Sequence, residues 1–147
     1  MAHAEQFAQD ATRRTVNGFY QAIEHRDINA LRNLVADDWQ YIASATVPSI
    51  GVDQMAAVFE SMQRALPDME IHVLDVLVND RMVGVRAQVK GTQHGELMGI
   101  EPTSKPIVFA VHSFHQIRDG LIEKTWHLED WMDCFRQIGS LPPGIQK

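Results

Sequence analysis

The chain has 147 residues, of which 45% are hydrophobic and 22% charged, and its formal net charge is -6. This size and composition predict one globular domain spanning residues 1–147. The acidic balance and the lack of a Lys/Arg run argue against a nucleic-acid partner, because phosphate binding needs a basic surface.

The first half of the chain predicts three helices and one short strand. Asp27 is a candidate N-cap for the second helix, Ala36-Asp37-Asp38 breaks that helix, and Pro67 ends the third. The apolar spacing places the helices at residues 5–25, 28–35 and 52–66 and the strand at residues 39–42.

The second half predicts strands that can pair as sequential hairpins, followed by a short helix at residues 131–138. The strands are expected at residues 69–78, 81–90, 107–118 and 121–130. Helices first and strands later indicate an α+β protein in which the helices pack on one face of a curved antiparallel sheet.

The last hairpin is rich in titratable groups, and two turn geometries remain open for it. If Asp119-Gly120 is a two-residue loop, His112 lies opposite His127. If that glycine is instead a left-handed bulge residue after a type I turn, Ser113 lies opposite Thr125. The second geometry places four polar residues on one face, namely Ser113, His115, Thr125 and His127.

Three stretches carry a resemblance to a known family. They are GTQHGELMGIEPT at residues 91–103, VNGFY at 16–20 with Ala30-Leu31 and Ala36-Asp37-Asp38, and DGLI at 119–122 with Trp126 to Asp130. Over nearly its whole length the chain resembles the SnoaL-like polyketide cyclases, or ester cyclases, of the nuclear transport factor 2-like superfamily. The resemblance favours the second hairpin geometry.

The resemblance implies a cone-shaped α+β barrel that encloses an apolar pocket, in a homodimer or higher homo-oligomer. It also implies closure of a ring in a polyketide ester by intramolecular aldol condensation, with no metal and no cofactor. The family's acid/base aspartate, directly after the strand tryptophan, corresponds to His127, and a second polar pocket position to Ser113. The family's GTH histidine is displaced, because Gln93 holds its place and His94 follows.

His127 is the central catalytic candidate, since imidazole exchanges protons near neutral pH. The supporting catalytic candidates are Ser113, His115 and Asp130. A half-buried histidine bonded to a carbonyl is the structural alternative. The candidate ligand-binding residues are Phe19, Trp39, Tyr41, Phe59, Arg86, His94, Met98, Thr125 and Glu129, although most of the apolar ones also fit a plain core.

His127, Glu129 and His115 have the residue types of a two-histidine, one-carboxylate metal site, but nothing resembles a dedicated zinc pattern. We therefore predict no metal. Trp126 and His112 share the opposite strand face and are expected to lie outside, at an oligomer interface.

Cys134 is the only cysteine, so no internal disulfide can form and a reducing compartment fits. The polar N-terminal stretch lacks the apolar core of a signal peptide, and no apolar run is long enough to span a bilayer. We expect a cytoplasmic protein without a membrane partner.

The first functional hypothesis is a cofactor-free cyclase that acts on an apolar, carbonyl-rich small molecule by acid/base catalysis. The second is a non-catalytic module of the same fold that binds a small molecule or mediates dimerisation. A hydrolase or isomerase on this scaffold is the third.

Overall fold

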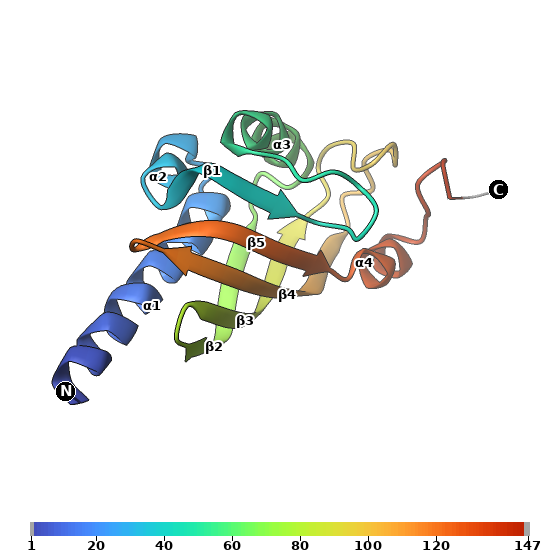
Figure 1. The fold of residues 1–147 in the computed structure, drawn as a ribbon. Coiled ribbons are helices and arrows are strands. Elements are labelled where there is room, and N and C mark those ends of the chain that lie inside the picture. Colours follow the sequence, from blue (N-terminus) through green and yellow to red (C-terminus); the bar gives the residue numbers. More distant parts are fainter. Residues whose placement is uncertain (1, 146–147) are drawn as a thin grey trace.

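The computed structural model describes residues 2–145 and confirms the α+β class (Figure 1). In chain order its elements are α1 (Ala2–Glu24), α2 (Ile28–Arg32), β1 (Val35–Ile42), α3 (Val52–Ala65), β2 (Glu70–Asn79), β3 (Met82–Thr92), β4 (Pro106–Arg118), β5 (Leu121–Glu129) and α4 (Trp131–Ile138).

The five strands form one curved sheet in the order β1-β5-β4-β3-β2. Strands β2 to β5 pair in succession as antiparallel neighbours, as the sequence predicts. Strand β1 completes the sheet by lying parallel to β5, a long-range pairing that the local pattern did not indicate. Strand β1 therefore brings its side chains beside those of the last hairpin.

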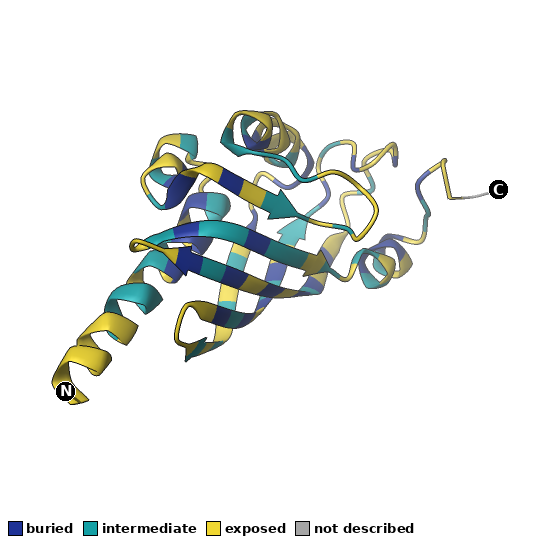
Figure 2. Ribbon diagram, viewed as in Figure 1, coloured by how far each residue is buried: buried dark blue, intermediate teal, exposed yellow. Residues whose placement is uncertain are grey.

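Buried and less buried residues alternate along the strands, as the colours of the ribbon show (Figure 2). On β3, the valines at positions 83, 85 and 89 are buried, whereas Arg86 and Lys90 are exposed. The buried faces of the strands pack against the C-terminal half of α1, where Val16 and Phe19 are fully buried. The N-terminal half of α1 extends beyond the sheet and is mostly exposed.

Two segments between the helices and the sheet differ from expectation. The second helix ends at Arg32 instead of Val35, and Ala36-Asp37-Asp38, expected as a break, belongs to β1. A distant segment causes this difference: Val35 pairs with Ile122 of β5, and both residues are buried. Tertiary pairing thus overrides the local turn preference of the two aspartates.

The β4–β5 turn is a two-residue loop, since Asp119 and Gly120 both have positive φ angles, 53° and 77°. The preferred bulge at Gly120 is therefore wrong. The extra residue is Glu123, because Ile117 pairs with Ile122 whereas Gln116 pairs with Lys124. One irregularity on β5 thus shifts the register of the rest of the hairpin.

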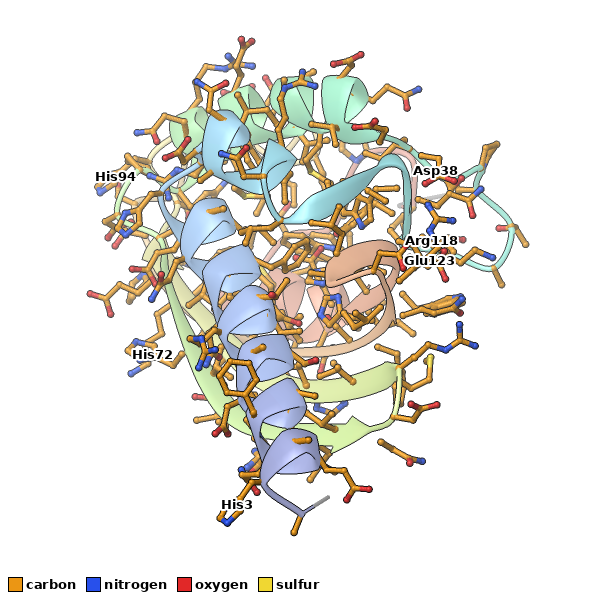
Figure 3. The ribbon with its side chains drawn as sticks, turned by 60° about the vertical axis from the view of Figure 1, so that its left-hand side comes forward. His3, Asp38, His72, His94, Arg118 and Glu123 are labelled. Carbon is orange, nitrogen blue, oxygen red and sulfur yellow. The ribbon has the colours of Figure 1, made fainter. Side chains whose placement is uncertain are left out.

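The arginine at the start of this turn ties the hairpin to β1 (Figure 3). One Arg118 Nη contacts the Asp38 carboxylate at 2.7 Å and the other contacts Glu123 at 2.8 Å. The Arg118 guanidinium holds the pKa of Asp38 below its ordinary value. The contact with Asp38 lies at the surface and contributes little to stability, whereas the Glu123 side chain is only 13% exposed.

Gln93 organises the loop between β3 and β4 and is completely buried. Its side-chain amide donates to the carbonyl oxygens of Ile100 and Glu101 and accepts a 2.6 Å hydrogen bond from the Thr103 hydroxyl. The GTQHGELMGIEPT stretch is therefore held together by Gln93, while His94 beside it points to solvent (Figure 3).

Candidate functional site

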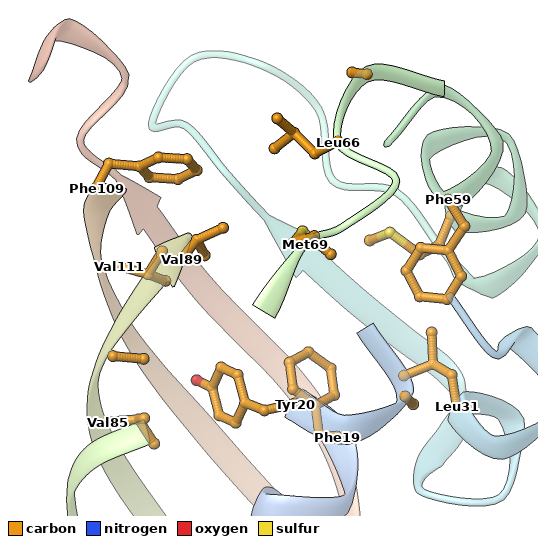
Figure 4. Packing of buried hydrophobic residues seen from close by; sticks show 14 of the residues in the cluster. Phe19, Tyr20, Leu31, Phe59, Leu66, Met69, Val85, Val89, Phe109 and Val111 are labelled. Carbon is orange, nitrogen blue, oxygen red and sulfur yellow. The ribbon is translucent and has the colours of Figure 1, made fainter. Parts of the chain in front are cut away.

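A small, mostly apolar and partly open cavity lies between α1, α3 and the inner face of the sheet. Its volume is about 60 Å³, enough for a few water molecules. The lining residues are Tyr20, Ile23, Arg26, Tyr41, Met55, Val58, Phe59, Met62, Met69, Ile71, Val89, Phe109, Val111, His127 and Glu129. Figure 4 shows the neighbourhood, with Tyr20 between Phe59 of α3 and the strand residues Val89 and Val111. A larger ligand would have to displace the flexible methionines of this wall.

His127 is the polar centre of the cavity and its side chain is only 9% exposed. The hairpin register places His127 directly across from Ser113, and the hydroxyl oxygen of Ser113 lies 2.8 Å from His127 Nδ1. The other ring nitrogen, Nε2, lies 3.4 Å from the Glu129 carboxylate. The Tyr41 ring, 5.3 Å away between centroids, covers the imidazole from β1. The imidazole thus has neighbours on three sides in a largely buried site.

A second polar group lies deeper, around His115, which is completely buried. His115 Nε2 lies 2.8 Å from the Tyr20 hydroxyl, and Nδ1 lies 3.0 Å from the Thr125 hydroxyl. Thr125 also accepts a 3.1 Å hydrogen bond from the indole Nε1 of Trp39. No buried side-chain nitrogen or oxygen in residues 2–145 lacks a partner, so this network meets the usual requirement for burying polar groups.

Burial fixes the protonation of these deeper groups. Desolvation, helped by the nearby His127, lowers the pKa of His115 to about 3, so its imidazole is neutral at physiological pH. Burial raises the pKa of Tyr20 above its ordinary value, and burial together with the Glu129 charge does the same for Tyr41. Both phenols therefore keep their protons and can donate hydrogen bonds.

The structure brings together most of the predicted polar residues. Ser113, His115, Thr125 and His127 share the inner face as expected, but Ser113 lies opposite His127 and not opposite Thr125. The alternative pairing of His112 with His127 is also wrong, because His112 pairs with Leu128 on the outer face.

The predicted aromatic residues and Glu129 fall into two groups. Phe19 and Trp39 are buried in the core and contact each other edge to face, with ring centroids 6.0 Å apart. Tyr41, Phe59 and Glu129 line the cavity itself.

Four predicted site residues lie away from the cavity. Arg86 is on the outer face, where its Nε donates a 2.8 Å hydrogen bond to Asp75. His94 and Met98 are exposed in the loop between β3 and β4. Asp130 is the N-cap of α4 and accepts a hydrogen bond from the Asp133 amide. An ion pair accounts for the position of Arg86, exposure to solvent for His94 and Met98, and helix capping for Asp130.

Tyr20 is a site residue that the sequence reading missed. It follows Phe19 in the apolar stripe of α1, so helical spacing indicates core, and its ring is indeed only 3% exposed. The signal that could have identified its role is the phenolic hydroxyl, since a buried tyrosine usually needs a partner.

A metal at His127 and Glu129 would need His115 as a further ligand. Both nitrogens of His115 already face hydroxyl oxygens within 3.0 Å, which leaves none free for a metal. Across residues 2–145, no cluster of three or more His, Cys, Asp or Glu side chains could hold a metal ion.

The outer face of the β4–β5 hairpin carries uncovered apolar side chains. Phe114 is 56% and Leu128 is 71% exposed, and Trp126, paired with Phe114, is half-buried. The expected outward placement of Trp126 and His112 is confirmed, whereas their role in an oligomer stays a prediction. Among the described residues, no helix is both long enough and apolar enough to cross a membrane.

Comparison with known proteins gives one family. The SnoaL-like polyketide cyclase family profile matches residues 14–138. No curated protein matches the chain.

Solved structures agree with this assignment. IdmH from Streptomyces antibioticus, a proposed polyketide cyclase, is 27% identical, with a TM-score of 0.77 over 87% of this chain and 98% of that one. A proposed SnoaL-like polyketide cyclase from Jannaschia sp. CCS1 is 19% identical, with a TM-score of 0.80 over 90% and 94% of the two chains. TsrD from Streptomyces laurentii is 20% identical, with a TM-score of 0.79 over 90% and 97%. The last two likenesses concern the fold alone.

Proposed function

Because the chain belongs to the SnoaL-like polyketide cyclase family, we propose that it closes a ring in a carbonyl-rich small molecule by intramolecular aldol addition. A carbon flanked by two carbonyls loses a proton, its electron pair forms a C–C bond to a ketone carbon in the same molecule, and the resulting alkoxide takes up a proton. The reaction is an isomerisation, so atoms and electrons balance without an oxidant or a reductant.

The observation that carries the proposal is the pairing of His127 with Glu129 inside the cavity, 3.4 Å apart. We assign the proton transfers to this pair, which gains one proton and passes from a net charge of -1 to 0. The pair then returns the proton to the alkoxide. Two coupled groups share such a proton, so the base is the pair and not one atom. The buried surroundings favour transfer, because bulk water has little access to the lone pairs.

The lining of the cavity favours an apolar, flat substrate. Its walls are mostly methionine, phenylalanine, valine and isoleucine side chains, and its polar residues are Tyr20, Arg26, Tyr41, His127 and Glu129. A ligand with its carbonyl oxygens at one edge and a hydrocarbon or aromatic body elsewhere complements this distribution. A highly charged substrate would leave most of its charges unpaired against this mostly apolar wall.

The test is turnover of an aryl β-keto ester that carries a ketone side chain, followed by the absorbance change on ring closure. We expect His127→Gln to lower kcat by about 100-fold or more, as loss of a general base typically does, while the Kd for the substrate stays within a few-fold. His94→Gln is the matched control, since this histidine is exposed in the loop between β3 and β4.

Equal turnover by wild type and His127→Gln would exclude the proposed base. Binding of the β-keto ester without any turnover would instead support the non-catalytic binding module.

A further inference from the structure

The proposed base leaves one polar group of the cavity without a role, the hydroxyl of Tyr41. The chain has two tyrosines, and both line the cavity. The Tyr20 hydroxyl lies 2.8 Å from His115 Nε2, whereas the Tyr41 hydroxyl forms no hydrogen bond with any of residues 2–145. Since every fully buried side-chain oxygen in this range has a partner, the Tyr41 oxygen is accessible and not sealed in the core. Its proton is therefore available to a ligand.

The backbone of β1 fixes the face on which this phenol lies. Tyr41 is the parallel-strand partner of Thr125, which is fully buried on the inner face of the sheet. The Tyr41 amide and carbonyl are hydrogen-bonded to Ile50 at 2.8 and 3.0 Å, so the free edge of the strand is covered at this point. Trp39, two residues earlier, donates its indole N–H to Thr125. Strand alternation therefore places Tyr41 on the same inner face as Trp39.

Two neighbouring rings hold the ring of Tyr41. The centroid of Trp39 lies 5.8 Å away with the planes at 53°, and the centroid of His127 lies 5.3 Å away with the planes at 39°. These contacts restrict the phenol and leave its hydroxyl unused. A donor that is already held in place loses little conformational entropy when a ligand binds.

The position of Tyr41 beside His127 indicates which substrate oxygen its hydroxyl meets. In the proposed reaction, the His127–Glu129 pair removes a proton from a carbon flanked by two carbonyls. The electron pair of the broken C–H bond spreads onto a carbonyl oxygen and forms an enolate. This oxygen is bound to the carbon next to the one that loses the proton, so it must lie close to the base. A donor packed against His127 is therefore placed for the enolate oxygen.

We propose that Tyr41 is a catalytic residue that donates a hydrogen bond to this enolate oxygen. The inference rests on the proposed function for the identity of the base. The phenol keeps its own proton, because burial and the charge of Glu129 raise the pKa of Tyr41 well above its ordinary value. The only proton that moves is the one gained by the His127–Glu129 pair. A fixed donor in a buried site stabilises the charge that develops in the transition state more than it stabilises the neutral ketone.

The test compares two small ligands that differ in the ability to form an enolate. Acetylacetone has a carbon flanked by two carbonyls, and its enolate has its own ultraviolet absorbance. Methyl propyl ketone has the same number of carbons but one carbonyl, and it stays neutral. We expect the wild type to bind acetylacetone as the enolate. Tyr41→Phe should weaken enolate binding by about 10- to 100-fold, the range for a hydrogen bond to a charged group, and should change the affinity for methyl propyl ketone by less than about 3-fold.

Ile71→Val is the matched control for the shape of the cavity. It shortens an apolar residue of the lining and removes no polar atom. It should therefore change the affinities for the two ligands by the same factor. A loss confined to the enolate then identifies an interaction with the charged oxygen.

Two further measurements separate this role from a structural one. Tyr41→Phe removes no hydrogen bond within residues 2–145, so its midpoint of urea denaturation should not fall below that of the wild type. An NMR label at the ζ carbon of tyrosine gives one signal for each of the two tyrosines. Acetylacetone should shift mainly the signal that is missing in Tyr41→Phe. A shift confined to the Tyr20 signal would contradict the inference.

Equal enolate affinity in the wild type and Tyr41→Phe would overturn the inference, and so would the failure of the wild type to bind the enolate. Acetylacetone has no further ketone for ring closure, so this result does not depend on the cyclase assay. Tyr41-dependent enolate binding without turnover of the β-keto ester would refute the proposed function alone. Turnover that depends on His127 but not on Tyr41 would refute this inference alone.

Discussion

Gly95 lies against the backbone of Arg64 so closely that a Cβ at this glycine would be 2.1 Å from the Arg64 carbonyl oxygen. The contact joins the loop after β3 to the C-terminal end of α3, where the amides of His94 and Gly95 donate to the Ala65 carbonyl. Since α3 supplies Met55, Phe59 and Met62 to the cavity wall, this junction sets the distance of that wall from the sheet.

Gly95→Ala should therefore destabilise the protein. The added methyl meets backbone atoms, which cannot rotate away as a side chain would, so we expect a loss of about 2–3 kcal/mol, the upper range for overpacking. The midpoint of urea denaturation measures the loss. Gly144→Ala is the control, because no atom lies within 4 Å of its Cβ position. Similar midpoints for the two variants would contradict the contact.

His115 should make stability dependent on pH in the acid range. Its pKa is lowered from 6.5 to about 3 in the folded protein, mainly by burial and next by His127, while Tyr20 and Thr125 face it without charge. Above pH 6.5 the ring is neutral in both states and has no effect. Below this value the unfolded chain binds a proton that the folded one excludes, so stability falls as pH falls, by about 1.4 kcal/mol per pH unit.

Denaturation of wild type and His115→Gln at about pH 7 and pH 5 isolates this contribution. Between these values the wild type should lose about 2 kcal/mol more than the variant. Parallel losses would mean that His115 is accessible to protons in the folded state.

Trp39 and Thr125 should show a strong energetic coupling. Trp39→Phe removes the 3.1 Å hydrogen bond to Thr125 and leaves the threonine with one donor fewer, which should cost about 1–2 kcal/mol. Thr125→Val leaves the indole N–H without an acceptor and should lower the free energy of unfolding by a similar amount or more. The double variant removes both polar groups, so its loss should be clearly less than the sum of the single losses. Additive losses in a double-mutant cycle would show that the two groups do not interact.

The exposed apolar strip formed by Met82, Phe114 and Leu128 should mediate association with a second copy of the chain. The neighbouring Arg86 is paired with Asp75, so two such faces can meet without strong charge repulsion. Sedimentation equilibrium should detect a dimer that Phe114→Lys weakens by at least about 10-fold, equivalent to about 1.4 kcal/mol. Val47→Lys, on an exposed loop, is the control. A monomer at all concentrations would refute the expectation.

Local patterns in the sequence predicted most elements because each is determined by its own residues. The terminal helix begins after its N-cap at Asp130 and ends at Gly139, which has a φ of 76°, and its predicted bounds match the structure. The four long strands were recognisable in the same way from runs of Val and Ile and from the turns between them.

Local sequence patterns could not predict geometry that depends on residues far away in the chain. Strand β1 was expected to start at Trp39, yet it begins at Val35 because β5 pairs with it there. The bulge at Glu123 depends on Arg118 and Gln116, which bond its carboxylate from neighbouring positions. The sequence pattern could not distinguish Tyr20 from a core residue, because His115, the hydrogen-bond partner of its hydroxyl, is 95 residues away along the chain.

The candidate site was recognised in part. Its residues on one strand face follow from simple alternation, so Ser113, His115, Thr125 and His127 could be grouped from the sequence. Whether that face looked inward or outward required the register of the whole sheet, which places Arg86 on the outer face. Met98 lies in a loop and Asp130 at a helix N-cap, so strand alternation does not determine their positions.

The three methionines around the cavity have a thermodynamic consequence for recognition. Unbranched thioether chains can change rotamer at little cost, so Met55, Met62 and Met69 can reshape a space of about 60 Å³ around guests of different outline. Selectivity would then reside at the rigid polar edge, where hydrogen-bonded groups cannot adapt. The affinity of the protein for a ligand should therefore depend mainly on the positions of the ligand's oxygen atoms. Changes in the hydrocarbon part of the ligand should alter the affinity little.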